Sequence, residues 1–264
     1  LCEDAYTITW TWVAIDLCEN ESTASTTITV IDTTPPAYET VPEDATVECS
    51  DELPAVVFPT AFDNCDQDVE ISLTEEIIDG DCPQEYTFNR IFRAIDNCGN
   101  STMFVQTINV VDTTAPVFAE PADETFECSD EITVTLPSAT DNCGEVTVSF
   151  ADGEQVPGEC ANEYSFTRTY TAIDECGNES STSNMIFVVD TTAPVFAAYD
   201  VELEMPCDNI MPTTLEATDN CGDVEVTYED TPVSGGCAGR IIRDYTAVDA
   251  CGNEATAQQI ITLV

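Results

Sequence analysis

Apolar and polar residues alternate along several short stretches of the chain. Three of them are 69–73 (VEISL), 146–150 (VTVSF) and 224–228 (VEVTY), and longer runs rich in β-branched and aromatic residues cover 6–16, 86–96 and 164–174. A period of two, with turn residues between the runs, is typical of half-buried strands in an antiparallel sheet. No segment has a convincing helical period. The pattern therefore predicts an all-β protein built as small sandwiches.

One polar, cysteine-bearing phrase occurs four times. It reads AIDLCEN from Ala14, AIDNCGN from Ala94, AIDECGN from Ala172 and AVDACGN from Ala247. A period in the high seventies indicates tandem domains. Each phrase ends a long strand and supplies turn residues for a hairpin into the next strand, with glycine suited to a positive φ.

Short proline-containing linkers separate the repeats: DTTPP from Asp32, and DTTAP from Asp112 and from Asp190. They are too short to act as flexible tethers. We expect a first repeat (1–34) that is the C-terminal hairpin of a truncated domain, followed by complete second (35–114), third (115–192) and fourth (193–264) repeats.

The charge narrows the possible partners. The chain has 52 acidic residues against 5 basic ones, all arginine, and a net charge of -47. Such a chain lacks the basic face that phosphate binding needs, and it favours divalent cations instead. We expect no nucleic-acid partner and, without a long apolar run, no direct membrane insertion.

The 14 cysteines indicate an oxidising, extracellular compartment. Each complete repeat has four, and strand direction places its first and third cysteines at one pole and its second and fourth at the other. Disulfides within each repeat and at each pole follow: Cys49–Cys82, Cys65–Cys98, Cys128–Cys160, Cys143–Cys176, Cys207–Cys237 and Cys221–Cys251. This pairing leaves Cys2 and Cys18 without partners in the chain, so an upstream segment or a neighbouring subunit would complete the first repeat.

Aspartates recur in the repeated phrase, in the linkers and before the second cysteine of each complete repeat (Asp63, Asp141, Asp219), and two interpretations stay open. They can cap turns through their own backbone, or they can bind Ca²⁺ near the joints. The leading calcium ligands are the linker residues, followed by two from the repeated phrase: Asp32, Asp112, Asp190, Asp96 and Asp174.

All five arginines lie on the long strands. Arg90, Arg168 and Arg243 share one repeat position, which Trp10 occupies in the first repeat. Cross-strand pairing with a carboxylate is the favoured interpretation, and ligand binding is the alternative. A sugar-binding role would depend on scattered aromatics such as Trp10, Trp12 and Tyr170.

Catalytic chemistry has little support. The chain has no histidine and no lysine, which removes the usual general bases and Schiff-base amines. We expect no enzymatic activity. Asn20, Asn100 and Asn178 fit the N-x-S/T pattern of N-glycosylation.

The phrases DNCG, AID-x-CGN and VVDTTAP resemble hyalin-repeat (HYR-like) modules, which are immunoglobulin-like β-sandwiches. Cysteine-rich arrays of this kind are similar to those of large bacterial surface proteins, including gliding-motility-type adhesins. The resemblance implies O-glycosylation after the linker aspartates, at Thr33, Thr113 and Thr191.

Two functions stay open. The first is a structural or adhesive segment of a cell-surface protein, a stiff stalk or filament whose partners are neighbouring repeats or subunits and surface glycans. The second is a spacer in a secreted multidomain enzyme or carbohydrate-binding protein.

Overall fold

The computed structural model describes the whole chain except residues 1, 3–4, 209 and 234–238. Its described residues form strands and turns without any helix. They fall into two compact units. The first unit holds Leu1–Pro116, Asp141–Val146 and Ile173–Asn178, and the second holds Val117–Thr140, Thr147–Ala172 and Glu179–Val264.

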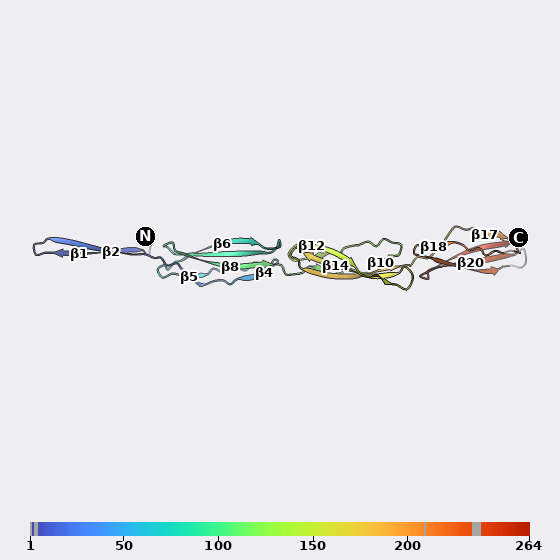
Figure 1. Cartoon of the computed structure of the whole chain (residues 1–264), viewed down its shortest axis with the longest axis horizontal. Helices are drawn as coiled ribbons and strands as arrows, with labels where there is room; N and C mark the ends of the chain where they lie inside the picture. The colour runs from blue at the N-terminus through green and yellow to red at the C-terminus, as the bar shows by residue number, and fades with distance from the viewer. Residues whose placement is uncertain (1, 3–4, 209, 234–238) are drawn as a thin grey trace. The chain divides into compact units, whose positions relative to one another are not determined.

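The first repeat is a two-stranded hairpin (Figure 1) of β1 (Tyr6–Ile15) and β2 (Glu21–Val30). Glu19, at the turn, has a φ of 65°, and its counterpart Gly99 has a φ of 90°. The left-handed turn that the repeated phrase predicts is therefore confirmed, and glutamate adopts it where glycine is replaced.

The second repeat contains a four-stranded sheet in the order β4-β8-β7-β6 and a separate pair, β3 with β5. Each predicted strand is present, and β6 extends further than the alternating run 69–73. The strands are β3 (Ala37–Thr40), β4 (Ala45–Glu48), β5 (Thr60–Phe62), β6 (Glu70–Asp79), β7 (Tyr86–Ile95) and β8 (Ser101–Val111).

The third and fourth repeats follow the same plan, with sheet orders β10-β15-β14-β12 and β17-β21-β20-β19. In the third repeat the strands are β9 (Val117–Phe118), β10 (Glu124–Glu127), β11 (Ala139–Thr140), β12 (Val146–Asp152), β13 (Val156–Pro157), β14 (Tyr164–Asp174) and β15 (Glu179–Val189). In the fourth they are β16 (Val195–Phe196), β17 (Glu202–Met205), β18 (Ala217–Thr218), β19 (Val224–Pro232), β20 (Arg240–Asp249) and β21 (Glu254–Leu263).

One edge strand of each sheet runs parallel to its neighbour, which the sequence did not predict. β4 pairs in parallel with β8, β10 with β15, and β17 with β21. A parallel pair needs a long crossover, and the rest of the repeat supplies it. The first cysteine of the repeat follows this edge strand, and the Cys49 N–H donates to the carbonyl of Val111, at the end of β8.

The core of each complete repeat lies on the inner face of its longest strand. Phe92, Tyr170 and Tyr245 occupy equivalent positions and are fully buried. In the second repeat Phe58 packs edge-on against Phe92, and the Tyr38 hydroxyl donates to the Phe92 carbonyl. A core this small gives limited stability, so cross-links and polar networks matter.

A buried arginine completes each core. Arg168 pairs in a bidentate manner with Asp152 of the neighbouring strand, at 2.6 and 3.0 Å, and its Nη1 donates to the carbonyl of Thr133. Arg243 pairs likewise with Asp230, and Arg90 approaches Glu75. The predicted cross-strand pairing is confirmed.

Candidate functional site: the joints between repeats

The cysteines, aspartates and linkers that the sequence singled out gather at the joints between repeats. The joint around Asp112 lies wholly within the first unit, and the joint around Asp190 lies wholly within the second. Each of these two joints therefore belongs to a single unit.

The disulfides connect successive repeats. The first cysteine of one repeat bonds the second cysteine of the next, and the third bonds the fourth of the next. Their Cα–Cα distances lie between 4.9 and 5.8 Å, within the range that a disulfide requires. The bonds are Cys2–Cys98, Cys49–Cys143, Cys82–Cys176, Cys128–Cys221 and Cys160–Cys251.

Five of the six disulfides predicted within repeats are therefore wrong. Cys49, Cys65, Cys82, Cys98, Cys128, Cys143, Cys160, Cys176, Cys221 and Cys251 do not form the predicted bonds, and the predicted Cys207–Cys237 bond falls on a residue outside the described ranges. The assignment of poles agrees with the structure, because Cys49 adjoins the end of β8 and Cys82 lies in the β6–β7 turn beside it. The prediction paired two cysteines at the same pole of one repeat. In the structure a short linker places that pole against the opposite pole of the next repeat, and the disulfides form between the two repeats.

The repeated phrase forms an aspartate-capped turn that also binds the linker. Asp174 Oδ1 accepts from the backbone N–H groups of Cys176 and Asn178, both at 2.9 Å, and Oδ2 accepts from the Asn178 side chain. Asn178 Nδ2 also donates to the carbonyl of Asp112, at 3.1 Å. Asn100 bonds Asp32 and Asn253 bonds Asp190 in the same manner. The turn-capping interpretation is confirmed, and its asparagine clamps the preceding linker.

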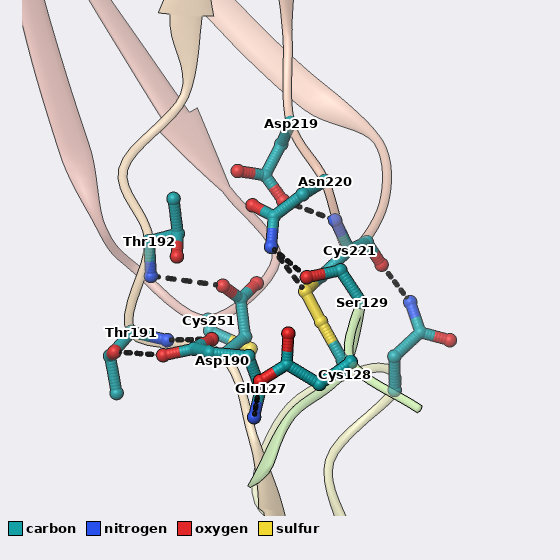
Figure 2. Close-up of a disulfide and its surroundings, with 12 residues drawn as sticks. Glu127, Cys128, Ser129, Asp190, Thr191, Thr192, Asp219, Asn220, Cys221 and Cys251 are labelled. Atoms are coloured by element: carbon teal, nitrogen blue, oxygen red, sulfur yellow. Dashed lines mark hydrogen bonds between the residues drawn. A yellow bond between two sulfur atoms is a disulfide. The ribbon is translucent and has the colours of Figure 1, made fainter. Parts of the chain in front are cut away.

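The threonines after the linker aspartates Asp112 and Asp190 bond back to an edge strand. Glu48, at the end of β4, accepts from both the N–H and the hydroxyl of Thr113. Figure 2 shows the equivalent arrangement around Glu127 and Thr191, beside the Cys128–Cys221 disulfide. The linker is thus held on both sides.

One further hydrogen bond crosses each of these two joints beside the disulfide. Asn142 Nδ2 donates to the hydroxyl of Ser50, and Asn220 Nδ2 donates to that of Ser129, each at 3.0 Å (Figure 2). Each asparagine precedes the second cysteine of its repeat, and each serine follows the first. Sequence reasoning missed these contacts, although both residues adjoin the cysteines.

Three carboxylates converge at the second-to-third joint. Asp112, Asp141 and Asp174 place ligand oxygens within 4.8 Å of one another, and Asp112 is only 5% exposed. Asp141 Oδ1 accepts from the N–H of Cys143, but its Oδ2 is buried without a partner. Asp219 Oδ2 has the same orphaned state at the next joint. An uncompensated buried carboxylate oxygen is costly, so this atom suits a cation.

At this joint the pKa values of two neighbouring aspartates are shifted in opposite directions. Burial raises the pKa of Asp112, a bond from Thr114 opposes this, and the charges of Asp141, Asp174 and Glu48 raise it further. Burial would also raise the pKa of Asp174, but its bonds from Asn178, Cys176 and Gly177 outweigh that effect and lower it. Asp190 and Asp249 repeat the contrast.

The predicted metal ligands are thus only partly brought together. Asp112 and Asp174 share a joint, Asp32 lies with Asp63 and Cys65, and Asp96 caps its turn through Asn100. Charges from Asp219 and Asp249 act on Asp190. Asp141 and Asp219 were not among the leading candidates. The phrase DNC around the second cysteine was their signal, since both joints carry it.

The structure also bears on the possible N-glycosylation and sugar-binding residues. Both hydrogens of Asn178 Nδ2 are used within the joint, so its N-x-S pattern serves the turn. Tyr170 is fully buried and cannot contact a sugar, whereas Trp10 and Trp12 are more than half exposed.

The family of the chain follows from these repeats. HYR-like domains with 4 cysteines match residues 38–110 and 116–188, which together are more than half of the chain. The chain belongs to this family. Its fold, tandem disulfide-bonded immunoglobulin-like sandwiches, agrees with the one predicted, and the protein is extracellular.

Two curated relatives are similar along almost the whole chain. Hyalin from Strongylocentrotus purpuratus is 33% identical over 286 residues, covering 98% of this chain and 23% of the relative. Hyalin from Lytechinus variegatus is 33% identical over 283 residues, covering 96% and 52%. The chain spans about a quarter and about half of their lengths. Both are sea-urchin proteins, and neither supports the finer prediction of a bacterial adhesin.

Solved cadherin structures are more distant. The protocadherin GammaB4 extracellular domain has 15% identity and a TM-score of 0.36, covering 99% of this chain and 56% of its own. Drosophila N-cadherin EC1-4 has 14% identity and a TM-score of 0.32, covering 97% and 83%. TM-scores this low support no conclusion about function. The described residues contain no helix able to span a membrane.

Proposed function

We propose that the chain is a stiff, tension-bearing segment of an extracellular adhesive protein, in which successive repeats are cross-linked at every joint. The observation that carries the proposal is the pair of disulfides that flanks the linker at each of the two joints around Asp112 and Asp190. Three covalent connections at one joint restrict bending and twisting far more than a linker alone.

The non-covalent contacts act in the same direction. The asparagine clamp, the Glu48–Thr113 bonds and the Asn142–Ser50 bond each cross or border the linker. In the chain-entropy model a disulfide that closes a loop of roughly a hundred residues contributes about 4–5 kcal/mol. Disulfides of this span join different repeats, so they stabilise the array and not a single sandwich. They also keep the repeats connected when the array is under tension.

Adhesion under flow tests this role in cells that display the parent protein. Replacing Cys82, Cys176, Cys160 and Cys251 with serine removes one disulfide from each of the two joints. We expect attachment in still medium to be retained and detachment under shear to increase several-fold. The exposed substitutions Glu145→Gln and Glu225→Gln serve as the control. Unchanged shear resistance in the cysteine variant would refute a tension-bearing role.

We also propose that Ca²⁺ binds at the joints. The donor set fits, because Asp112, Asp141 and Asp174 offer hard oxygen ligands and Asp141 Oδ2 has no other partner. A bound cation would neutralise the carboxylates and stiffen the joint. The leading candidates at the other joints are Asp32 with Asp63, and Asp190 with Asp219; Asp96 serves its turn.

Calcium binding is measured by the melting temperature of the oxidised chain in millimolar Ca²⁺ against EDTA. A ligand present at a hundred times its Kd stabilises by about 2.7 kcal/mol, which corresponds to several degrees. Asp141→Asn with Asp219→Asn keeps the Oδ1 acceptor and should remove most of the rise, while Glu145→Gln with Glu225→Gln should retain it. Equal melting temperatures in Ca²⁺ and EDTA would exclude the sites.

Several finer assignments are proposals that other measurements decide. We also propose repeat boundaries at 34, 114 and 192, the absence of enzymatic activity and a bacterial surface setting. The parent reading frame tests all three.

O-linked glycans at Thr33, Thr113 and Thr191 are tested by the mass of the intact protein. The hydroxyls of Thr113 and Thr191 donate to Glu48 and Glu127, so a glycan there would replace those bonds.

A further inference from the structure

Three disulfides join end to end through the long strands of two repeats. In the second and third repeats the third and fourth cysteines flank the longest strand, and each bonds a different neighbouring repeat. The resulting path runs, in order, through Cys2, Cys98, β7, Cys82, Cys176, β14, Cys160 and Cys251. It crosses each strand from its C-terminal to its N-terminal end, opposite to the direction in which the chain advances between repeats.

We infer that this path is a covalent tether that limits how far the protein can be stretched, even when its repeats unfold. The inference extends the proposed role in bearing tension, but it concerns the chain itself. Its basis is the connectivity of the disulfides and needs no adhesive partner.

The lengths show how large the effect is. The main chain from Cys2 to Cys251 has about 249 residues and could extend to roughly 850 Å at ~3.4 Å per residue. The tether contains only about 32 residues, in its two strand crossings, and would extend to roughly 110 Å. Its three disulfides add Cα–Cα spans of 4.9, 5.1 and 5.0 Å. The oxidised chain is therefore limited to about a seventh of the extension of the reduced chain.

The second set of disulfides is not part of this tether. The main-chain segment between Cys128 and Cys143 connects the Cys49–Cys143 disulfide to the Cys128–Cys221 disulfide. This second route starts at Cys49 and ends at Cys221, so it does not reach the ends of the chain. Tension applied at the ends is carried by the shortest route. The two disulfides of one joint thus differ in mechanical role although both cross the same linker.

Optical tweezers on the purified chain, pulled through peptide tags at its two ends, test the inference. All proteins carry Cys18→Ser, because Cys18 is an exposed free thiol. We expect the oxidised chain to show no unfolding step of a whole repeat, which would release ~250 Å. Reduction should restore such steps. Whole-repeat steps in the oxidised chain would overturn the inference.

Two variants of the same joint supply the matched comparison. In Cys82→Ser/Cys176→Ser the shortest route follows the main chain from Cys98 to Cys128, crosses the Cys128–Cys221 disulfide and continues from Cys221 to Cys251. It contains about 60 residues, so the maximal extension grows by roughly 100 Å. In Cys49→Ser/Cys143→Ser the tether is intact and the extension should not change. Equal extensions in the two variants would contradict the tether. If the tether is found but shear resistance in cells is unaffected, the property stands and the proposed role fails.

Discussion

The side chain of Asn178 donates a hydrogen bond to the main-chain carbonyl of Asp112, 66 residues earlier, at 3.1 Å. The same nitrogen bonds the carboxylate of Asp174, 2.9 Å away. One amide thus joins the turn that closes a hairpin of one repeat to the linker that leaves the preceding one. The same bond at Asn100 and Asn253 makes it a property of the repeat.

Removing this amide should weaken the joint. Asn178→Ala leaves the Asp112 carbonyl and one oxygen of Asp174 without a donor, and losing a partner of a buried acceptor costs about 1–3 kcal/mol. We expect a lower urea midpoint for the third repeat and faster hydrogen exchange at the 173–178 turn. Ser181→Ala, on an exposed position of β15, should leave both unchanged. A variant as stable as the parent protein would show that the clamp contributes nothing.

The carboxylates of the joints predict an unusual pH dependence in EDTA. Because burial and neighbouring charges raise the pKa of Asp112 and Asp190, the folded state holds these protons at a higher pH than the unfolded chain does. Their deprotonation therefore lowers stability as the pH rises through that window. At lower pH, protonation of Asp174, whose pKa is lowered, should destabilise its turn.

Asp112→Asn with Asp190→Asn separates this effect from the overall charge. At neutral pH in EDTA the variant should melt a few degrees higher than the parent protein, and acidification should stabilise it less. In Ca²⁺ the ranking should reverse, because two ligands are lost. Glu145→Gln with Glu225→Gln removes as many charges at exposed positions. If this control matches the joint variant in both media, the joint has no special role.

The buried arginine should not tolerate lysine. Arg168→Lys keeps the charge but cannot reproduce the bidentate pair with Asp152 together with the bond to Thr133, and we expect a loss of about 2 kcal/mol. Arg93→Lys provides the control, since Arg93 is exposed and its guanidinium bonds Ser101. Urea unfolding of the two variants measures the difference. Equal midpoints would mean that any cation suffices in the core.

The glycine of the repeated turn tests backbone strain. Gly177 has a φ of 90°, and a Cβ added there would meet no atom within 4 Å, so conformation alone sets the cost of substitution. Gly177→Ala should lose about 1–2 kcal/mol and Gly177→Asn less, because asparagine tolerates the left-handed region better. Urea midpoints in that order support the explanation. A larger loss in Gly177→Asn would point to another cause.

Local patterns predicted much of the fold from sequence. Alternation located the strands, and the phrase around Cys98 predicted a turn with a left-handed residue. The parallel edge strand was not predicted, because β4 is only four residues long and its partner lies about sixty residues away. Short strands carry too few side chains to show which neighbour they will join.

The site was predicted less completely than the fold. The linker aspartates and the cysteines were the right residues, but the bonds between them join separate repeats. Reach and strand direction constrain partners inside one sandwich, and they say little about which poles meet across a linker. Asp141 was left out of the leading ligands for the same reason, since it belongs to one repeat and lies near Asp112 at the end of another.

Peptide mapping under non-reducing conditions tests the central claim, that the cysteines link successive repeats. Digestion of the oxidised chain, followed by mass spectrometry, should recover the peptide of Cys82 bonded to that of Cys176, and the peptide of Cys49 bonded to that of Cys143. Recovery of Cys82 bonded to Cys49 instead, or of these cysteines as free thiols, would contradict the account.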